Sequence, residues 1–143
     1  MTGETGEKVI MARLLVAYVA AALTMAVLDY AWLSYFTKAL FEPAVGSLLA
    51  ERTDMTIAVL FYVLYVIGVL LFATFPALRS GGWSTALGLG AAFGFFVYMT
   101  YDFTNMATLK VWPVWLAAID IAWGTCVTAI AATAGYLAAS RMA

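Results

Sequence analysis

Three aspartates stand inside otherwise apolar stretches of this chain: Asp29 within "LDYAWL", Asp102 within "YDFTNMATLK" and Asp120 within "AIDIAW". A charged aspartate at the centre of a membrane-spanning helix costs roughly 2.5–3.5 kcal/mol on the insertion scale. Such residues therefore face the interior of a helix bundle and find partners there. A carboxyl group inside a membrane is a candidate for ligand binding or for proton handling.

Polar and aromatic side chains lie near each aspartate at helical spacing, because positions three and four apart share one face of a helix. Asp102 shares its face with Tyr98 and Asn105. The other two aspartates are each followed three residues later by a tryptophan, and either an old duplication or coincidence explains this Asp-x-Ala-Trp repeat. The predicted polar pocket consists of Asp29, Trp32, Tyr98, Asp102, Asn105, Lys110, Asp120 and Trp123.

Each member of this pocket has an expected role. Asp102 and Asp120 carry the charge chemistry, and Lys110 is their counter-ion or an anchor for an anionic head group. Asn105 and Asp29 orient them, while the two tryptophans line the pocket. A purely structural interpretation stays open, in which the acids only lock helices together. Polar contacts between membrane helices contribute only about 0.6 kcal/mol on average, less than the insertion cost, which favours a functional pocket.

The residue content excludes several kinds of catalytic and cofactor site. The chain has no histidine and one cysteine, Cys126, which rules out disulfides within the chain, zinc–thiolate sites, histidine-ligated haem and histidine-based catalysis. Carboxylate and amide oxygens suit Mg²⁺, Ca²⁺ or Mn²⁺, but no recognised ligand spacing is present, so we expect no metal and no cofactor. Cys126 is expected to fill space in the core.

The overall composition indicates a membrane protein. Hydrophobic residues make up 66% of the 143 residues and charged residues only 10%, whereas a soluble domain carries about 25% charged residues. Such a chain has too little polar surface to face water on all sides, so its surroundings must be mostly lipid. Its net charge of −1 and the lack of a basic stripe argue against binding to nucleic acid.

Four segments are long and apolar enough to span a bilayer, which needs about 20 residues. They cover about 9–36, 55–75, 83–105 and 111–139, after a polar tail at 1–8, and residues 9–143 form one transmembrane domain. The stretch 37–54 is expected to be an outer connection along the membrane surface, and "PALRSGG" (76–82) a tight turn. Short connections join antiparallel neighbours, so we predict an all-α membrane fold, a four-transmembrane-helix antiparallel bundle.

The even number of spans puts both termini on one side of the membrane. Four basic residues fall on that side and three on the other, which favours a cytoplasmic location for the termini. Counted from the opposite, outward face, the three aspartates then lie at roughly the same depth, about 7–14 Å. Tyr62 and Tyr65 lie at a similar depth in the second span. Trp83, Trp112 and Trp115 suit the aromatic belts at the membrane interfaces.

Small residues recur every fourth position in the third span, at Ala86, Gly90 and Gly94. This small-xxx-small pattern lets two helices approach closely. We expect it to pack within the bundle, and a dimer interface is the alternative.

The patterns "LDYAWL", "YDFTNMATLK" followed by "WP", and "IDIAWGT" resemble a family of small bacterial inner-membrane proteins, catalogued as domain of unknown function 2177. The resemblance covers nearly the whole chain from Met11 onwards. It implies a multi-pass, four-helix protein of the bacterial inner (cytoplasmic) membrane. It implies no particular activity.

Taken together, these features favour a membrane protein whose outward-side pocket binds or moves a small or amphipathic ligand, with proton coupling as an open extension. A lipid, a quinone or a carotenoid would suit its aromatic walls. An enzyme is not the favoured interpretation, because no activated serine or cysteine and no phosphate-binding loop is present. A lipid-modifying enzyme and an accessory subunit of a larger membrane complex remain alternatives. Besides the lipid bilayer, the expected partners are a second copy of the chain, which transport would favour, or that larger complex.

Overall fold

The computed structural model describes residues 2–142, with side chains described from Gly6 onwards, and this part of the chain is helical with short connections. In chain order the elements are α1 (Thr2–Trp32), the π-helix η1 (Leu33–Phe41), α2 (Glu42–Val45), the 3₁₀-helix η2 (Gly46–Leu48), α3 (Met55–Val69), the π-helix η3 (Leu70–Thr74), α4 (Phe75–Ser80), α5 (Trp83–Thr108) and α6 (Val114–Ser140).

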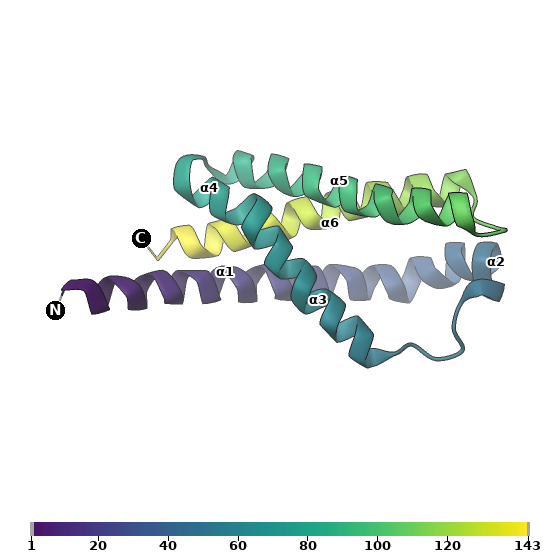
Figure 1. The fold of residues 1–143 in the computed structure, drawn as a ribbon, viewed down its shortest axis with the longest axis horizontal. Coiled ribbons are helices and arrows are strands. Elements are labelled where there is room, and N and C mark those ends of the chain that lie inside the picture. The colour runs from purple at the N-terminus through teal and green to yellow at the C-terminus, as the bar shows by residue number, and fades with distance from the viewer. Residues whose placement is uncertain (1, 143) are drawn as a thin grey trace.

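These elements form four continuous helical rods that are long and apolar enough to cross a membrane: Gly6–Leu48, Met55–Ser80, Trp83–Thr108 and Val114–Ser140. The prediction of an all-α fold with four spans is therefore confirmed. Both termini lie at the same end of the molecule (Figure 1). Helix α1 begins at Thr2, so the residues expected to form a polar tail continue the first helix.

Two predicted connections are largely helical instead. Most of the stretch 37–54 extends the first rod through η1, α2 and η2, and only residues 49–54 lack helical structure. Asp54 then begins α3, because its Oδ1 accepts hydrogen bonds from the backbone N–H groups of Thr56 and Ile57 at 2.9 and 3.2 Å. An aspartate at this position satisfies two of the unpaired N–H groups at a helix start.

The expected turn at 76–82 was placed too early. Pro76 lies inside the second rod, which continues to Ser80, and the turn is made by Gly81 and Gly82. A proline lacks the N–H that an α-helix needs and its ring crowds the preceding turn. The π-helix η3 provides a wider turn at this point, in which Phe75 N–H bonds the carbonyl of Leu70 five residues back. The helix therefore continues past the proline.

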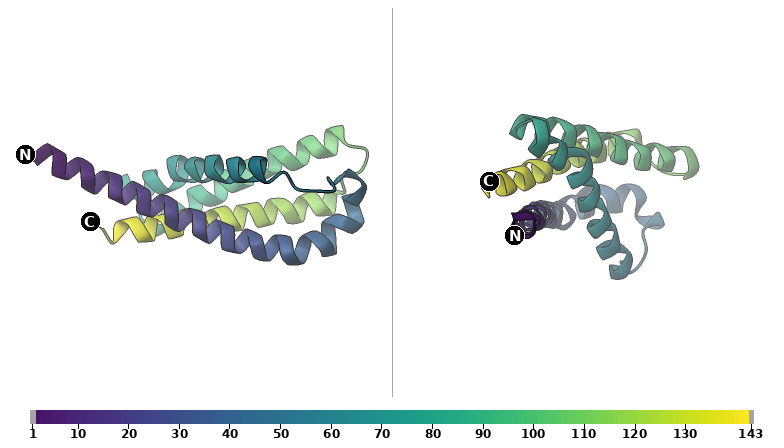
Figure 2. Two further views of the ribbon diagram at one scale, coloured as in Figure 1. Left: turned by 90° about the horizontal axis from the view of Figure 1, so that it is seen from below. Right: turned by 60° about the vertical axis from the view of Figure 1, so that its left-hand side comes forward.

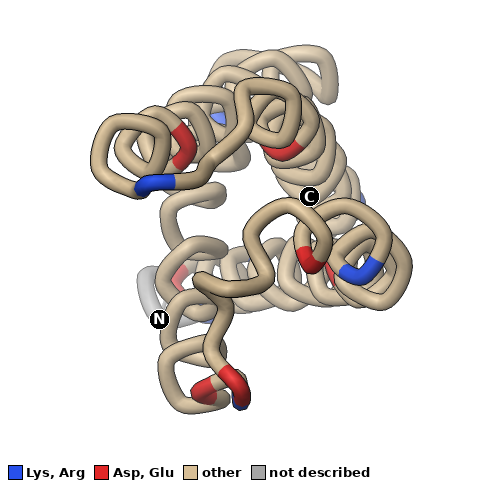
Figure 3. Tube along the Cα trace, turned by 90° about the vertical axis from the view of Figure 1, so that its right-hand side faces the viewer, with Lys and Arg blue, Asp and Glu red and all other residues tan. Residues whose placement is uncertain are grey.

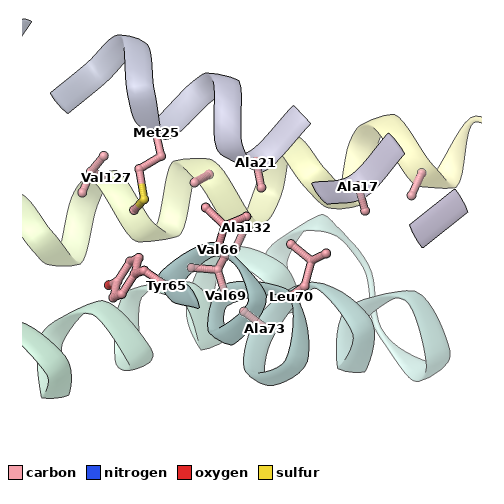
Figure 4. Close-up of a cluster of buried hydrophobic side chains, with 12 residues drawn as sticks. Ala17, Ala21, Met25, Tyr65, Val66, Val69, Leu70, Ala73, Val127 and Ala132 are labelled. Atoms are coloured by element: carbon pink, nitrogen blue, oxygen red, sulfur yellow. The ribbon is translucent and has the colours of Figure 1, made fainter. Parts of the chain in front are cut away.

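Helices α1, α5 and α6 lie alongside one another, while α3 crosses them obliquely (Figure 1). The right-hand view of Figure 2 shows the start of α3 standing away from the other helices. Where α3 meets the bundle, small and branched side chains form the buried core, among them Ala21 and Met25 of α1 and Val66 and Val69 of α3 (Figure 4).

The closest helix pair is α5 with α6. A Cβ atom added at Gly90 would lie 2.8 Å from the Cβ of Ala132 and 3.0 Å from the Cα of Ala129. One added at Gly94 would collide with the backbone carbonyl oxygen of Gly124. Because the small residues of the third span face α6, they pack within the bundle, as expected.

Cys126 is exposed on α6, so the prediction that it fills the core was wrong. It shares its face with Ala122 and Ile130, which are exposed as well. In a membrane protein the lipid-facing surface and the core are both apolar, so residue type alone does not separate them.

Candidate functional site

Asp29 connects three helices. It is 6% exposed, its Oδ2 accepts a 2.9 Å hydrogen bond from the Tyr62 hydroxyl of α3, and its Oδ1 accepts a 3.0 Å bond from the Trp123 indole N–H of α6. Each oxygen of this buried carboxyl group therefore has its own donor. Tyr62 is one of the two phenols that the sequence placed at this depth.

Asp102 is fully buried on α5 and has only one such donor. Its Oδ1 accepts a 3.0 Å hydrogen bond from the Trp112 indole N–H, whereas no N–H or O–H group within residues 2–142 donates to its Oδ2. The carboxyl group of Asp120 on α6 lies within hydrogen-bonding range. Two carboxyl groups can form a hydrogen bond only when one of them carries a proton, so this contact is a place to hold a proton.

Asp120 differs from the other two aspartates, because it lines two cavities, whereas Asp29 lines one of them and Asp102 neither. It is 8% exposed, and its only side-chain hydrogen bond in the described part of the chain is the contact with Asp102. A buried carboxyl group without an N–H or O–H donor is costly unless a proton or an external group satisfies it. Asp120 is therefore the group best placed to contact a ligand.

The larger of the two cavities at Asp120, with a volume of about 270 Å³, is called the acid pocket below. It is walled by aromatic, aliphatic and carboxyl side chains: Asp29, Trp32, Leu33, Thr37, Phe41, Leu49, Tyr62, Tyr98, Tyr101, Asp120 and Trp123. The rings of Trp32 and Trp123 are stacked, with centroids 4.5 Å apart and planes 7° apart. The pocket thus combines flat aromatic faces with two carboxyl groups.

A second cavity of about 210 Å³ reaches Asp120 from another side and is called the lateral pocket below. Its lining is Phe61, Val97, Tyr98, Tyr101 and Asp120. Phe61 and Tyr101 are 47% and 54% exposed on helices that cross the membrane, so this opening faces the lipid. Tyr98, Tyr101 and Asp120 line both pockets.

The remaining predicted residues lie outside the acid pocket. Asn105 is half-buried on α5, within hydrogen-bonding range of the Tyr101 hydroxyl. Lys110 is exposed in the connection after α5, and within the described chain its side chain forms no ion pair or hydrogen bond. The structure therefore does not bring Lys110 to the carboxyl groups as their counter-ion, and an uncharged tryptophan, Trp112, contacts Asp102 instead.

Sequence reasoning missed several members of the site. Trp112 was assigned to the interface belt, yet it is half-buried and donates to Asp102. The residues from η1 and the following connection, Leu33, Thr37, Phe41 and Leu49, were not predicted at all, because they carry no charge. The four-residue spacing of Leu33, Thr37 and Phe41 was the available signal, since a π-helix has slightly more than four residues per turn.

Comparison with known protein families gives one match. Residues 14–137 match the family described as predicted membrane protein (DUF2177). The chain belongs to the DUF2177 family. Neither the curated proteins nor the solved structures yield a match. The matched range contains all three aspartates and both pockets, so the site of this DUF2177 protein lies wholly within the family domain.

The site lies towards the end of the DUF2177 domain that is opposite the termini. Asp29 is in the second half of the first rod, Asp102 near the end of α5 and Asp120 near the start of α6, as their antiparallel directions require. Figure 3 looks onto this end and shows acidic positions on several of the helices that surround the middle of the bundle.

Proposed function

We propose that this DUF2177 protein binds or moves a small amphipathic ligand in the acid pocket. The observation that supports the proposal is Asp120: a buried carboxyl group to which no N–H or O–H group of the described residues donates, reached by two cavities. Ligand pockets typically combine apolar and aromatic walls with a few polar groups that fix orientation. The acid pocket has this composition.

The two openings favour an amphipathic ligand over a fully water-soluble one. The lateral pocket lies between exposed aromatic side chains of α3 and α5, which face acyl chains in a membrane. A molecule dissolved in the bilayer can reach Asp120 by this route with its apolar part still in lipid. The lipid, quinone and carotenoid classes expected from the sequence share this property.

The direct test is to purify the protein gently from membranes and to identify bound small molecules by mass spectrometry. We expect a molecule in the wild type and in Glu51→Gln, an exposed acid in the connection before α3, and its loss in Asp120→Asn. The reason is that Asp120 lines the pocket, whereas Glu51 does not. A molecule retained equally in Asp120→Asn contradicts this site, and a fixed-stoichiometry protein partner without any bound molecule favours the accessory-subunit alternative.

The proposal includes an orientation in the bacterial inner membrane, with the termini in the cytoplasm and the pocket towards the outer side. Basic residues support it: Lys8, Arg13, Arg79 and Arg141 fall at the end with the termini, and Lys38, Arg52 and Lys110 at the other. A green fluorescent protein fused after Ala143 should fluoresce, and alkaline phosphatase fused there should be inactive. A non-fluorescent fusion together with active alkaline phosphatase contradicts the orientation. That result does not bear on the proposal that the acid pocket binds a ligand.

A further inference from the structure

We infer that the ligand of the acid pocket is a small lipophilic organic cation, and that its binding displaces the proton shared by Asp102 and Asp120. The inference rests on the proposed function and names the ligand's charge and its coupling. It depends on three features of the structure: the charges around the pocket, the aromatic walls and the carboxyl pair behind them.

Two carboxyl groups line the pocket, and no lysine or arginine of the described residues is among its lining. Within residues 2–142, no lysine or arginine forms an ion pair with Asp29, Asp102 or Asp120, and Lys110 is exposed in its connection. An anionic head group would therefore meet like charge without compensation, whereas a cation would supply the missing opposite charge. The same described residues hold no group of three ligating side chains able to bind a metal ion. A diffuse organic cation fits this arrangement better than a metal.

The aromatic walls favour a cation that carries apolar groups. Three tyrosine rings and the stacked pair of Trp32 and Trp123 line the pocket. Aromatic faces attract cations within about 6 Å, by about 0.5–1 kcal/mol at exposed sites and about 2 or more where water is excluded. The volume of about 270 Å³ suits a cation with one ring or a short chain rather than a long acyl tail.

The carboxyl pair couples binding to a proton. The titratable groups facing Asp120 are Asp102, Tyr98 and Tyr101 of α5, Asp29 of α1 and Tyr62 of α3. Asp29 already accepts two hydrogen bonds, so the group that shares a proton with Asp120 is Asp102. When a cation contacts Asp120, the proton between the two carboxyl groups is repelled and leaves to the solvent. One positive charge replaces another, and the net charge of the cluster with its contents does not change.

The test uses benzyltrimethylammonium and its uncharged carbon isostere, neopentylbenzene, with the full-length protein in phosphatidylcholine nanodiscs. Calorimetric titration in two buffers of different ionisation enthalpy gives the affinity and the number of protons released. The wild type should bind the cation in preference to the isostere and release about one proton. Its affinity should rise by up to about tenfold per pH unit, because a proton competes with the cation.

Two variants separate the roles of the carboxyl pair. Asp120→Asn should weaken cation binding roughly 10- to 100-fold, the value of a charged contact. Asp102→Asn should still bind the cation, yet release no proton and lose the pH dependence. A circular dichroism spectrum and a gel-filtration elution volume equal to those of the wild type show that each variant is folded. If Asp120→Asn is misfolded, the proton release and pH dependence of Asp102→Asn still test the coupling.

The outcomes distinguish this inference from the proposed function. Equal binding of the isostere, or unchanged cation binding in folded Asp120→Asn, overturns the inference that the ligand is a cation. A neutral molecule that co-purifies with the wild type would still support ligand binding in the acid pocket. Proton release that persists in Asp102→Asn overturns the coupling. Failure of the wild type to bind either probe, together with no co-purifying molecule, overturns the inference and the proposed function alike.

Discussion

Replacing Gly94 by alanine is expected to destabilise the folded protein by about 1–3 kcal/mol. The added methyl group would collide with the backbone carbonyl oxygen of Gly124 and with the side chain of Thr128. A backbone atom cannot rotate away as a side chain can, so α5 and α6 must separate and lose packing along the contact. Unfolding in mixed detergent micelles, followed by tryptophan fluorescence, measures the change.

Gly88→Ala is the matched control. It makes the same substitution on the same helix, but no atom lies within 4 Å of the added methyl group. Its stability should be unchanged or raised by up to about 1 kcal/mol, because alanine favours a helix more than glycine does. Equal effects at Gly88 and Gly94 would show that helix propensity, rather than contact with α6, determines the result.

Asp29→Leu is expected to weaken the association of the helices by about 1–3 kcal/mol. The change removes the acceptor for Tyr62 and Trp123, and polar contacts between membrane helices contribute about 0.6 kcal/mol each on average, up to about 1.7. It also removes a carboxyl group that would face lipid if the helix left the bundle. The cost of that exposure favours the assembled bundle, and leucine does not incur it. The same detergent unfolding measures it.

Asp29→Asn provides the comparison, since an amide retains an oxygen to accept from Trp123 and keeps nearly the same shape. We expect Asp29→Asn to lose less than half of the stability that Asp29→Leu loses. A double-mutant cycle between Asp29→Asn and Tyr62→Phe isolates the bond to the tyrosine. Full stability of Asp29→Leu would mean that the three-helix connection contributes nothing to the fold.

The sequence was sufficient for the number of spans, since an apolar stretch of membrane length has few alternatives. The ends of the spans were less predictable. Pro76 and the charged residues after Phe36 are ordinary signals for a break, yet π-helical turns carry the helix through both places. A π-helical turn differs from an α-helical one by a hydrogen bond that reaches one residue further back, and this shift leaves little trace in residue types. Such turns are therefore seen in the structure and not in the sequence.

Convergence of the three aspartates followed from antiparallel geometry and from the cost of charge in lipid. The hydrogen-bond partners of these aspartates could not be predicted in the same way. Nothing in the residue pattern connects Trp123 with Asp29 on another helix rather than with Asp120 on its own, or brings Trp112 back from a connection to Asp102. These contacts depend on rotations of the helices about their axes, which are set by packing, such as the seating of Tyr98 on Gly124.

The oblique crossing of α3 has a mechanical consequence. Helices α5 and α6 touch through their backbones at Gly94 and Gly124 and cannot slide or tilt without breaking that contact. Phe61 and Tyr62 of α3 each form part of the wall of one pocket, and the start of this helix stands apart from its neighbours (Figure 2). The start of α3 is therefore a part of the molecule that can shift without breaking the contact between α5 and α6.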